Sequence, residues 1–143
     1  MTISTEQAIM NLMAAYSYCV DDGDFAGFGD LFAHGEYVAA GTSVRGSKAV
    51  EAFATDALRI HEDGTPRTRH VVTNISLHVD DEAGTATARA YYTVFQALAD
   101  FPLRAVGGGQ YRDRFERVDG EWRFAKRTVT IDMVGDTSRL MRS

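Results

Sequence analysis

With 143 residues, the chain has the length of one domain, which we assign to residues 1–143. Apolar residues make up 45% and charged residues 24%, an ordinary globular composition, and the formal net charge of −5 argues against nucleic acid or an anionic membrane as a partner. Because no apolar run approaches a membrane span and the start MTISTEQ lacks the features of a signal peptide, we expect a cytoplasmic protein.

The first predicted element is an amphipathic helix that ends near Gly23. Ser4 is a suitable N-cap, and Gln7 follows three residues later, as in a capping box. Apolar residues then recur at helical spacing and form one stripe: Ile9, Leu12, Met13, Tyr16 and Val20. At about 100° per residue, Asp21 falls at the edge of this stripe and Asp22 on the solvent side.

Two further helices are predicted before residue 60. Asp24 can cap a short helix with an aromatic-rich face that needs burial: Phe25, Phe28, Leu31 and Phe32. A short strand over residues 36–40 then leads through the turn GTSVRG to a third helix capped by Ser47. The apolar face of this third helix has helical spacing: Val50, Phe53, Ala54, Ala57 and Leu58.

From His70 onward the apolar period changes to two, which is typical of β-strands. Strands are predicted over residues 70–79, 85–98, 103–118 and 121–133. Asp119-Gly120 is a hairpin signal, and the three glycines at 107–109 indicate a bulge or sharp bend. We therefore expect an α+β fold, with three N-terminal helices on a strongly curved, mixed or mostly antiparallel sheet that encloses a cavity.

The best candidate for a functional site is the pair formed by Asp21 and His70. A carboxylate that orients an imidazole is the minimum apparatus for proton abstraction near neutral pH. A carboxylate is also unfavourable at a helix C-terminus, by roughly 0.3–1 kcal/mol, so a second role for Asp21 is expected. The structural alternatives are a solvated helix end for Asp21 and a hydrogen-bonded strand-edge histidine for His70.

Other polar residues fall on strand faces that could line the same cavity. Arg127 is either a stabiliser of an oxyanion or leaving group, or the partner of Asp113 or Asp132 in a salt bridge. Tyr111 and Asp113 share an inward face of their strand. Of Tyr91 and Tyr92 one should point inward, and we assign Tyr92 to substrate binding.

Asn74 and Cys19 are weaker candidates. Asn74 could hydrogen-bond a substrate, or could form a local turn at a bulge. Cys19 is the only cysteine, which excludes an intrachain disulfide, and it is best interpreted as a small buried hydrophobe. With no carboxylate or cysteine at ligand spacing around the other histidines, no metal site is expected. These histidines are His34, His61 and His78.

Four stretches of the chain together resemble the nuclear transport factor 2-like superfamily, and within it the SnoaL-like group. They are the helix end VDDGDFAGFGDLF, the strand start RHVVTN, the hairpin GGQYRDRFERVDGEWRFAKR and the tail DMVGD. The resemblance covers nearly the whole chain and implies a cone-shaped, cystatin-like fold. Its members include scytalone dehydratase, polyketide cyclases, hexachlorocyclohexane dehydrochlorinase and the non-catalytic β subunits of ring-hydroxylating dioxygenases.

The local match is closest to the dehydrochlorinase members. Their catalytic aspartate, catalytic histidine and cavity arginine match Asp21, His70 and Arg127. Their lysine, one and a half turns before the aspartate, is replaced here by Tyr16, which suits a hydroxyl or carbonyl substrate, as in the dehydratase-like members.

The resemblance implies a cofactor-independent lyase or isomerase that uses an Asp–His dyad on a small, apolar, cyclic substrate. Arg127 and Tyr16 would stabilise charge, and Tyr92, Tyr111, Asp113 and Asn74 would bind substrate. A non-catalytic ligand-binding or assembly domain is the alternative, and epoxide hydrolysis is a weaker one. The resemblance also implies a homo-oligomer, either a dimer or a trimer.

Overall fold

The computed structural model describes residues 2–142, which form three helices and one six-stranded sheet. The helices are α1 (Thr5–Asp21), α2 (Phe25–Asp30) and α3 (Ser47–Ala57). The strands are β1 (Glu36–Ala39), β2 (Thr42–Arg45), β3 (Thr68–Asp80), β4 (Thr85–Leu98), β5 (Phe101–Val118) and β6 (Glu121–Val134). The predicted α+β architecture is therefore confirmed. No helix in this part of the chain has the length and apolarity needed to cross a membrane.

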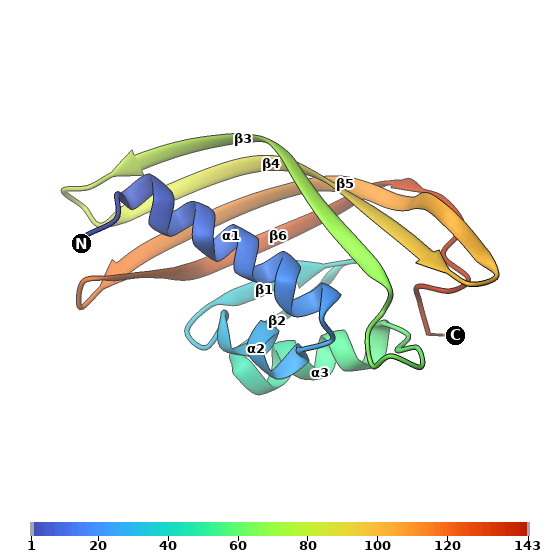
Figure 1. Cartoon of the computed structure of the whole chain (residues 1–143). Helices are drawn as coiled ribbons and strands as arrows, with labels where there is room; N and C mark the ends of the chain where they lie inside the picture. Colours follow the sequence, from blue (N-terminus) through green and yellow to red (C-terminus); the bar gives the residue numbers. More distant parts are fainter. Residues whose placement is uncertain (1, 143) are drawn as a thin grey trace.

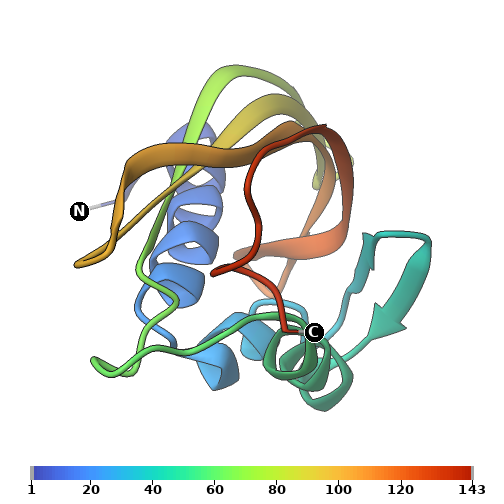
Figure 2. The same cartoon turned by 90° about the vertical axis from the view of Figure 1, so that its right-hand side faces the viewer.

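The sheet is mixed and its strand order is β2-β1-β6-β5-β4-β3. All neighbouring strands are antiparallel except β1 and β6, which are parallel. The four long strands β3 to β6 curve over α1, and the sheet does not close on itself (Figures 1 and 2). Because β3 is an edge strand, its start lies free to meet the end of α1.

Bulges and a tight turn give the sheet its curvature. The register shifts between Gly108 and Gly109 on the β5–β6 side, which confirms the irregularity expected from the glycine run. A Cβ on Gly109 would lie 1.8 Å from the carbonyl oxygen of Thr130, so only glycine permits this approach of the strands. Asp119 and Gly120 both have positive φ, 53° and 81°, and form the predicted hairpin turn.

The first helix begins as predicted, although its cap is only half of a capping box. Ser4 Oγ accepts a hydrogen bond from the backbone N–H of Gln7 at 3.1 Å. The side chain of Gln7 instead donates to Asn11 Oδ1 at 2.7 Å, so the reciprocal bond is missing. The apolar stripe of α1 packs against the concave side of the sheet, which explains why a helix with this spacing forms here.

Aromatic rings occupy much of the concave side, where a cavity was expected. Tyr16 contacts Phe28, Phe32, Tyr37 and Tyr111, with ring centroids between 5.1 and 6.4 Å apart. Rings from α1, α2, β1 and β5 thus meet at one point beneath the sheet. A hollow lies at the side of this aromatic cluster, between α1 and β3.

Three local predictions need correction. The stretch predicted as the turn GTSVRG contains a strand, β2, because residues 42–45 pair with β1. Ser47 is the first residue of α3 and not its cap; Gly46 takes the cap position with φ 89°, where a residue with a Cβ would be strained. Strand β3 begins at Thr68, two residues before the predicted start, because Thr68 pairs with Gln96.

Candidate active site

The structure brings Asp21 and His70 into direct contact. Nδ1 of His70 lies 2.7 Å from Oδ1 of Asp21, and the backbone N–H of His70 donates to Oδ2 at 2.9 Å. The carboxylate sits at the last residue of α1 and the imidazole at the third residue of β3, 49 positions apart in sequence. With Nδ1 held by an acceptor, the neutral ring carries its hydrogen on Nδ1 and presents an unprotonated Nε2.

A third donor completes the environment of Asp21. Thr68 Oγ1 donates to Oδ1 at 2.7 Å, so Asp21 accepts hydrogen bonds from Thr68 and twice from His70. Asp21 is 8% exposed and Thr68 1%. Three donors around a buried carboxylate offset the cost of removing it from water and fix its orientation.

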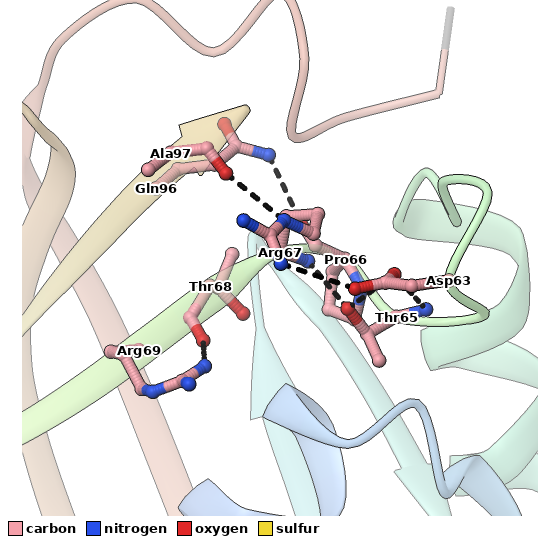
Figure 3. A network of polar contacts seen from close by, with 8 residues as sticks. All are labelled: Asp63, Thr65, Pro66, Arg67, Thr68, Arg69, Gln96 and Ala97. Carbon is pink, nitrogen blue, oxygen red and sulfur yellow. Dashed lines mark hydrogen bonds and ion pairs between the residues drawn. The ribbon is translucent and has the colours of Figure 1, made fainter. Parts of the chain in front are cut away.

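The loop before β3 holds the strand start in place (Figure 3). Arg67 has a positive φ of 61°. Its Nε donates a hydrogen bond to the carbonyl of Ala97 at 3.1 Å, and its Nη1 donates one to Asp63 at 3.2 Å. The buried amide of Gln96 donates to the carbonyl of Pro66 at 2.9 Å. Because the chain is tied to β4 just before Thr68, the first residues of β3 are directed toward the end of α1.

A groove of about 540 Å³ runs between α1 and β3, and Asp21 and His70 form part of its wall. The rest of the lining is mainly apolar and comes from both elements: Met10, Met13, Ala14, Val71, Val72 and Ile75. Nε2 of His70 forms no hydrogen bond to any residue in the described part of the chain. A ligand in the groove could therefore contact this nitrogen.

Ser17 adds a hydroxyl to the same groove, one helical turn before Asp21. Its Oγ is buried and has no hydrogen-bond partner within residues 2–142. A buried hydroxyl without a partner costs roughly 1–3 kcal/mol, so a ligand oxygen at this point would relieve that cost. Ser17 lines the groove, although neighbouring atoms cover its Oγ in this structure.

Arg127 lies deeper and is bound on several sides. Its Nε and Nη2 donate to the two carboxylate oxygens of Asp113, both at 2.8 Å, and both side chains are fully buried. The guanidinium lies 3.7 Å from the ring centre of Tyr111 and 4.3 Å from that of Tyr16. Burial alone would lower the pKa of Arg127. The charge of Asp113 and its hydrogen bonds outweigh this effect and raise the pKa above its usual value, so the residue is permanently charged.

Arg127 thus forms a salt bridge with Asp113, which is one of the two roles that the sequence predicted for it. Nη1 of Arg127 is buried without a partner in the described residues. Arg127 does not line the groove beside His70, and neither does Asp113.

The predicted tyrosines belong to the interior. Tyr16 is 4% exposed, and its hydroxyl is 2.9 Å from that of Tyr37. Burial raises the pKa of Tyr16 and raises the pKa values of Tyr37 and Tyr111 well above their usual range, so all three are neutral hydroxyls. Tyr16 contacts the imidazole of His70 edge-on, with ring centres 6.5 Å apart, so it supports the ring from behind.

Tyr92 and Asn74 lie away from the groove. The ring of Tyr92 stacks on Tyr111 at 4.5 Å, and burial raises the pKa of Tyr92 to about 12. Tyr92 lines a different hollow, beside Gly107–Gly109. Asn74 is exposed at the β3 bulge with φ 55°, the left-handed conformation that asparagine tolerates.

Sequence reasoning missed Thr68, Ser17 and the apolar lining of the groove. Thr68 has the same strand parity as His70, and Ser17 precedes Asp21 by four residues on a helix, so both spacings were available as signals. Neither spacing predicts that α1 packs against the β3 edge. No cluster of three metal-binding side chains occurs between residues 2 and 142.

Comparison with known proteins places the chain in a family. The model of the SnoaL-like domain matches residues 1–128. Among solved structures, a variant of Rv3472, a protein of unknown function from Mycobacterium tuberculosis, is 28% identical with a TM-score of 0.74, over 89% of this chain and 76% of its own. No curated protein matched the sequence.

Two structures from Novosphingobium aromaticivorans are each 25% identical. A candidate scytalone dehydratase has a TM-score of 0.70 over 92% of this chain and 86% of its own. The β subunit of a candidate aromatic-ring-hydroxylating dioxygenase has a TM-score of 0.69, over 90% and 89%. Other neighbours are described as NTF2-like proteins or as having a cystatin-like fold. With most of its length matched by the family model, the chain belongs to the SnoaL-like domain family.

Proposed function

We propose that this protein is a cofactor-independent lyase or isomerase that acts on a small, largely apolar, cyclic substrate bound in the groove between α1 and β3. The observation that carries the proposal is the contact between Asp21 and His70 on the wall of that groove, with Nε2 of His70 bonded to no residue from 2 to 142. The similarity to a candidate scytalone dehydratase supports a reaction of this class.

In the proposed reaction, Nε2 of His70 removes a proton from a carbon of the substrate. The electron pair of the broken C–H bond either forms a double bond and expels a leaving group, or moves to a conjugated oxygen and returns when another carbon takes up the proton. Asp21 holds the hydrogen on Nδ1 and stabilises the imidazolium that forms. Thr68 keeps the carboxylate in position from behind.

Ser17 is the group we assign to the substrate oxygen. Ser17 lines the same groove as His70, and rotation of its side chain would turn its hydroxyl, which has no partner among residues 2–142, toward the substrate. A neutral donor in a partly desolvated site stabilises negative charge that develops on oxygen. Arg127 and Tyr16 lie behind this site, and in the proposal they hold His70 and the aromatic cluster in place and do not contact the substrate.

A non-catalytic role is the second candidate, and exposed apolar residues favour it. Ile131, Met133 and Val134 near the end of β6, with Leu103 on β5, are between 52% and 72% exposed. The dioxygenase β subunit in the comparisons is part of an assembly, and such residues could form contacts between chains. In that case the groove would bind a ligand without converting it.

Proton exchange measured by NMR tests the proposal without knowledge of the natural substrate. A panel of cyclic ketones and cyclic β-hydroxy ketones is incubated in D2O with the native protein and with His70→Gln. We expect the native protein to catalyse deuterium uptake next to the carbonyl, or loss of water, for at least one compound. His70→Gln should lower this rate about 100-fold or more, the usual contribution of a positioned base.

The matched control is His34→Gln, because His34 is exposed and lies outside the groove. Equal rates for His70→Gln and His34→Gln would overturn the proposal. Binding of panel compounds at Ser17 and His70, detected by amide shifts but without exchange or elimination, would favour the non-catalytic alternative.

A further inference from the structure

Four cations form an array on the sheet face turned away from α1. Arg89 on β4 lies directly opposite Arg112 on β5, and Arg114 on β5 lies directly opposite Lys126 on β6. Arg112 and Arg114 are two residues apart on one strand and therefore share a face. The residue between them, Asp113, is buried and points inward to the core.

The charge of this array is poorly compensated within the chain. Lys126 approaches Glu36 at 3.8 Å, whereas Arg89, Arg112 and Arg114 form no ion pair with any residue from 2 to 142. Like charges directly opposite each other destabilise a sheet. A bound anion would relieve this repulsion.

The surroundings of the array fit a small anion. A hollow of about 490 Å³ includes all four cations together with His78 and hydroxyl groups such as that of Thr87. Asp113 also borders it, but its carboxylate is buried and paired with Arg127. The two cation pairs are offset by two residues, roughly 6.7 Å along the strand, so they can contact two neighbouring anionic groups. Arginine binds phosphate oxygens with two parallel hydrogen bonds.

A second copy of the chain is a poor occupant of this face. In a two-fold interface centred on the array, the cations of one copy would lie against those of the other. We propose instead that the array, defined by Arg89, Arg112, Arg114 and Lys126, binds a soluble small molecule that carries a diphosphate group. The site lies on the opposite side of the sheet from the groove and is independent of the function proposed above.

Calorimetry and NMR with inorganic pyrophosphate test the site at constant ionic strength. We expect the native protein to bind one pyrophosphate, with amide shifts at Thr87 and Thr128, and to bind monophosphate more weakly. Arg112→Gln should weaken pyrophosphate binding about 10- to 100-fold, the loss expected for charge-assisted hydrogen bonds. The matched control, Arg104→Gln, removes one exposed arginine outside the array and should bind as the native protein does.

Thermal unfolding gives a second readout. At low salt and without pyrophosphate, Arg112→Gln should unfold at a higher temperature than the native chain, because one repelling charge is removed. Equal affinities for Arg112→Gln and Arg104→Gln, or no binding by the native protein, would overturn the proposal. So would a dimer that dissociates in Arg112→Gln, because the array would then be an interface between copies.

Discussion

Within residues 2–142, Asp113–Arg127 and Asp21–His70 are two largely buried pairs of a carboxylate and a nitrogen-bearing side chain, and they differ in which nitrogen atoms remain without a partner. Asp113 occupies Nε and Nη2 of Arg127, and aromatic rings cover the guanidinium, so the pair is sealed inside the sheet. Asp21 occupies one nitrogen of His70 and leaves the other without a partner in residues 2–142, and His70 lines a groove. One pair is thus enclosed by the fold, whereas the other keeps a nitrogen for the proton transfer proposed above.

The two pairs should therefore affect different properties of the protein, the first its stability and the second its activity. A sealed ion pair contributes to function only through the fold, whereas a half-open pair can exchange a proton with a ligand. Changes at Asp113 should therefore alter stability first, and changes at His70 should alter turnover first.

The largest effect is expected on catalysis at His70. In the exchange assay, His70→Gln should lose about two to four orders of magnitude in rate, because the proton acceptor is removed. Its unfolding midpoint in urea should shift much less than that of a variant at Asp113. A variant that loses stability and rate together would show that His70 acts only through the fold.

The next effect is on the sealed pair. Asp113→Asn should lower the free energy of unfolding by about 3–5 kcal/mol, because it leaves the charge of Arg127 buried without a counter-ion. Urea denaturation followed by circular dichroism measures this change. Asp132→Asn is the control, since Asp132 is exposed and accepts a hydrogen bond from Gln110 at 3.2 Å.

Replacement of both partners sharpens this prediction. The double variant Asp113→Leu/Arg127→Met should recover most of the lost stability, because apolar side chains of similar size need no counter-charge. If the double variant remains as unstable as Asp113→Asn, the hydrogen bonds of the ion pair stabilise the fold in a way that apolar side chains of similar size do not.

A smaller effect is expected at Thr68, which touches Asp21 and not the ligand. Thr68→Val should lower the exchange rate about fivefold, the equivalent of one hydrogen bond of about 1 kcal/mol, and Thr68→Ser should restore it. Imidazole 15N shifts supply the readout that a purely structural role would not move. The fraction of the Nδ1–H tautomer of His70 should fall in Thr68→Val and return in Thr68→Ser.

The sequence predicted those parts of the fold that depend on local spacing. The stripe of α1, the Asp119-Gly120 hairpin and the bounds of β4 all follow from periods of 3.6 and 2 or from turn chemistry. The short strand β2 was missed because its four residues are exposed or half-buried and show no apolar alternation. It forms through backbone pairing with β1, which no spacing rule detects.

The candidate site was likewise predicted only in part. The resemblance and the acid at a helix end indicated Asp21 and His70, and the structure brings them together. It does not bring Tyr16, Tyr92 or Asn74 to the groove, because residue type alone cannot tell a cavity wall from an aromatic core. The two possible roles of Arg127 depended on its partner, and only the β5–β6 register places Asp113 opposite it.

A further effect, on stability alone, is expected at alkaline pH, where the buried tyrosines of the sealed region titrate. Burial raises the pKa of Tyr92 to about 12 in the folded chain, against 10 when it is exposed. Between these values the unfolded chain loses the proton first, so stability is intact below pH 10 and falls as the pH rises. The slope for one such group is about 1.4 kcal/mol per pH unit.

Urea unfolding at several pH values between about 9 and 12 measures this slope. Tyr92→Phe should show a shallower loss than the native chain by one proton, whereas Tyr18→Phe, at a residue that is 68% exposed, should follow the native curve. Parallel curves for the native chain and Tyr92→Phe would mean that the Tyr92 ring reaches water in the folded state. The region around Arg127 would then be less sealed than the aromatic packing implies, and the contrast with the open groove at His70 would weaken.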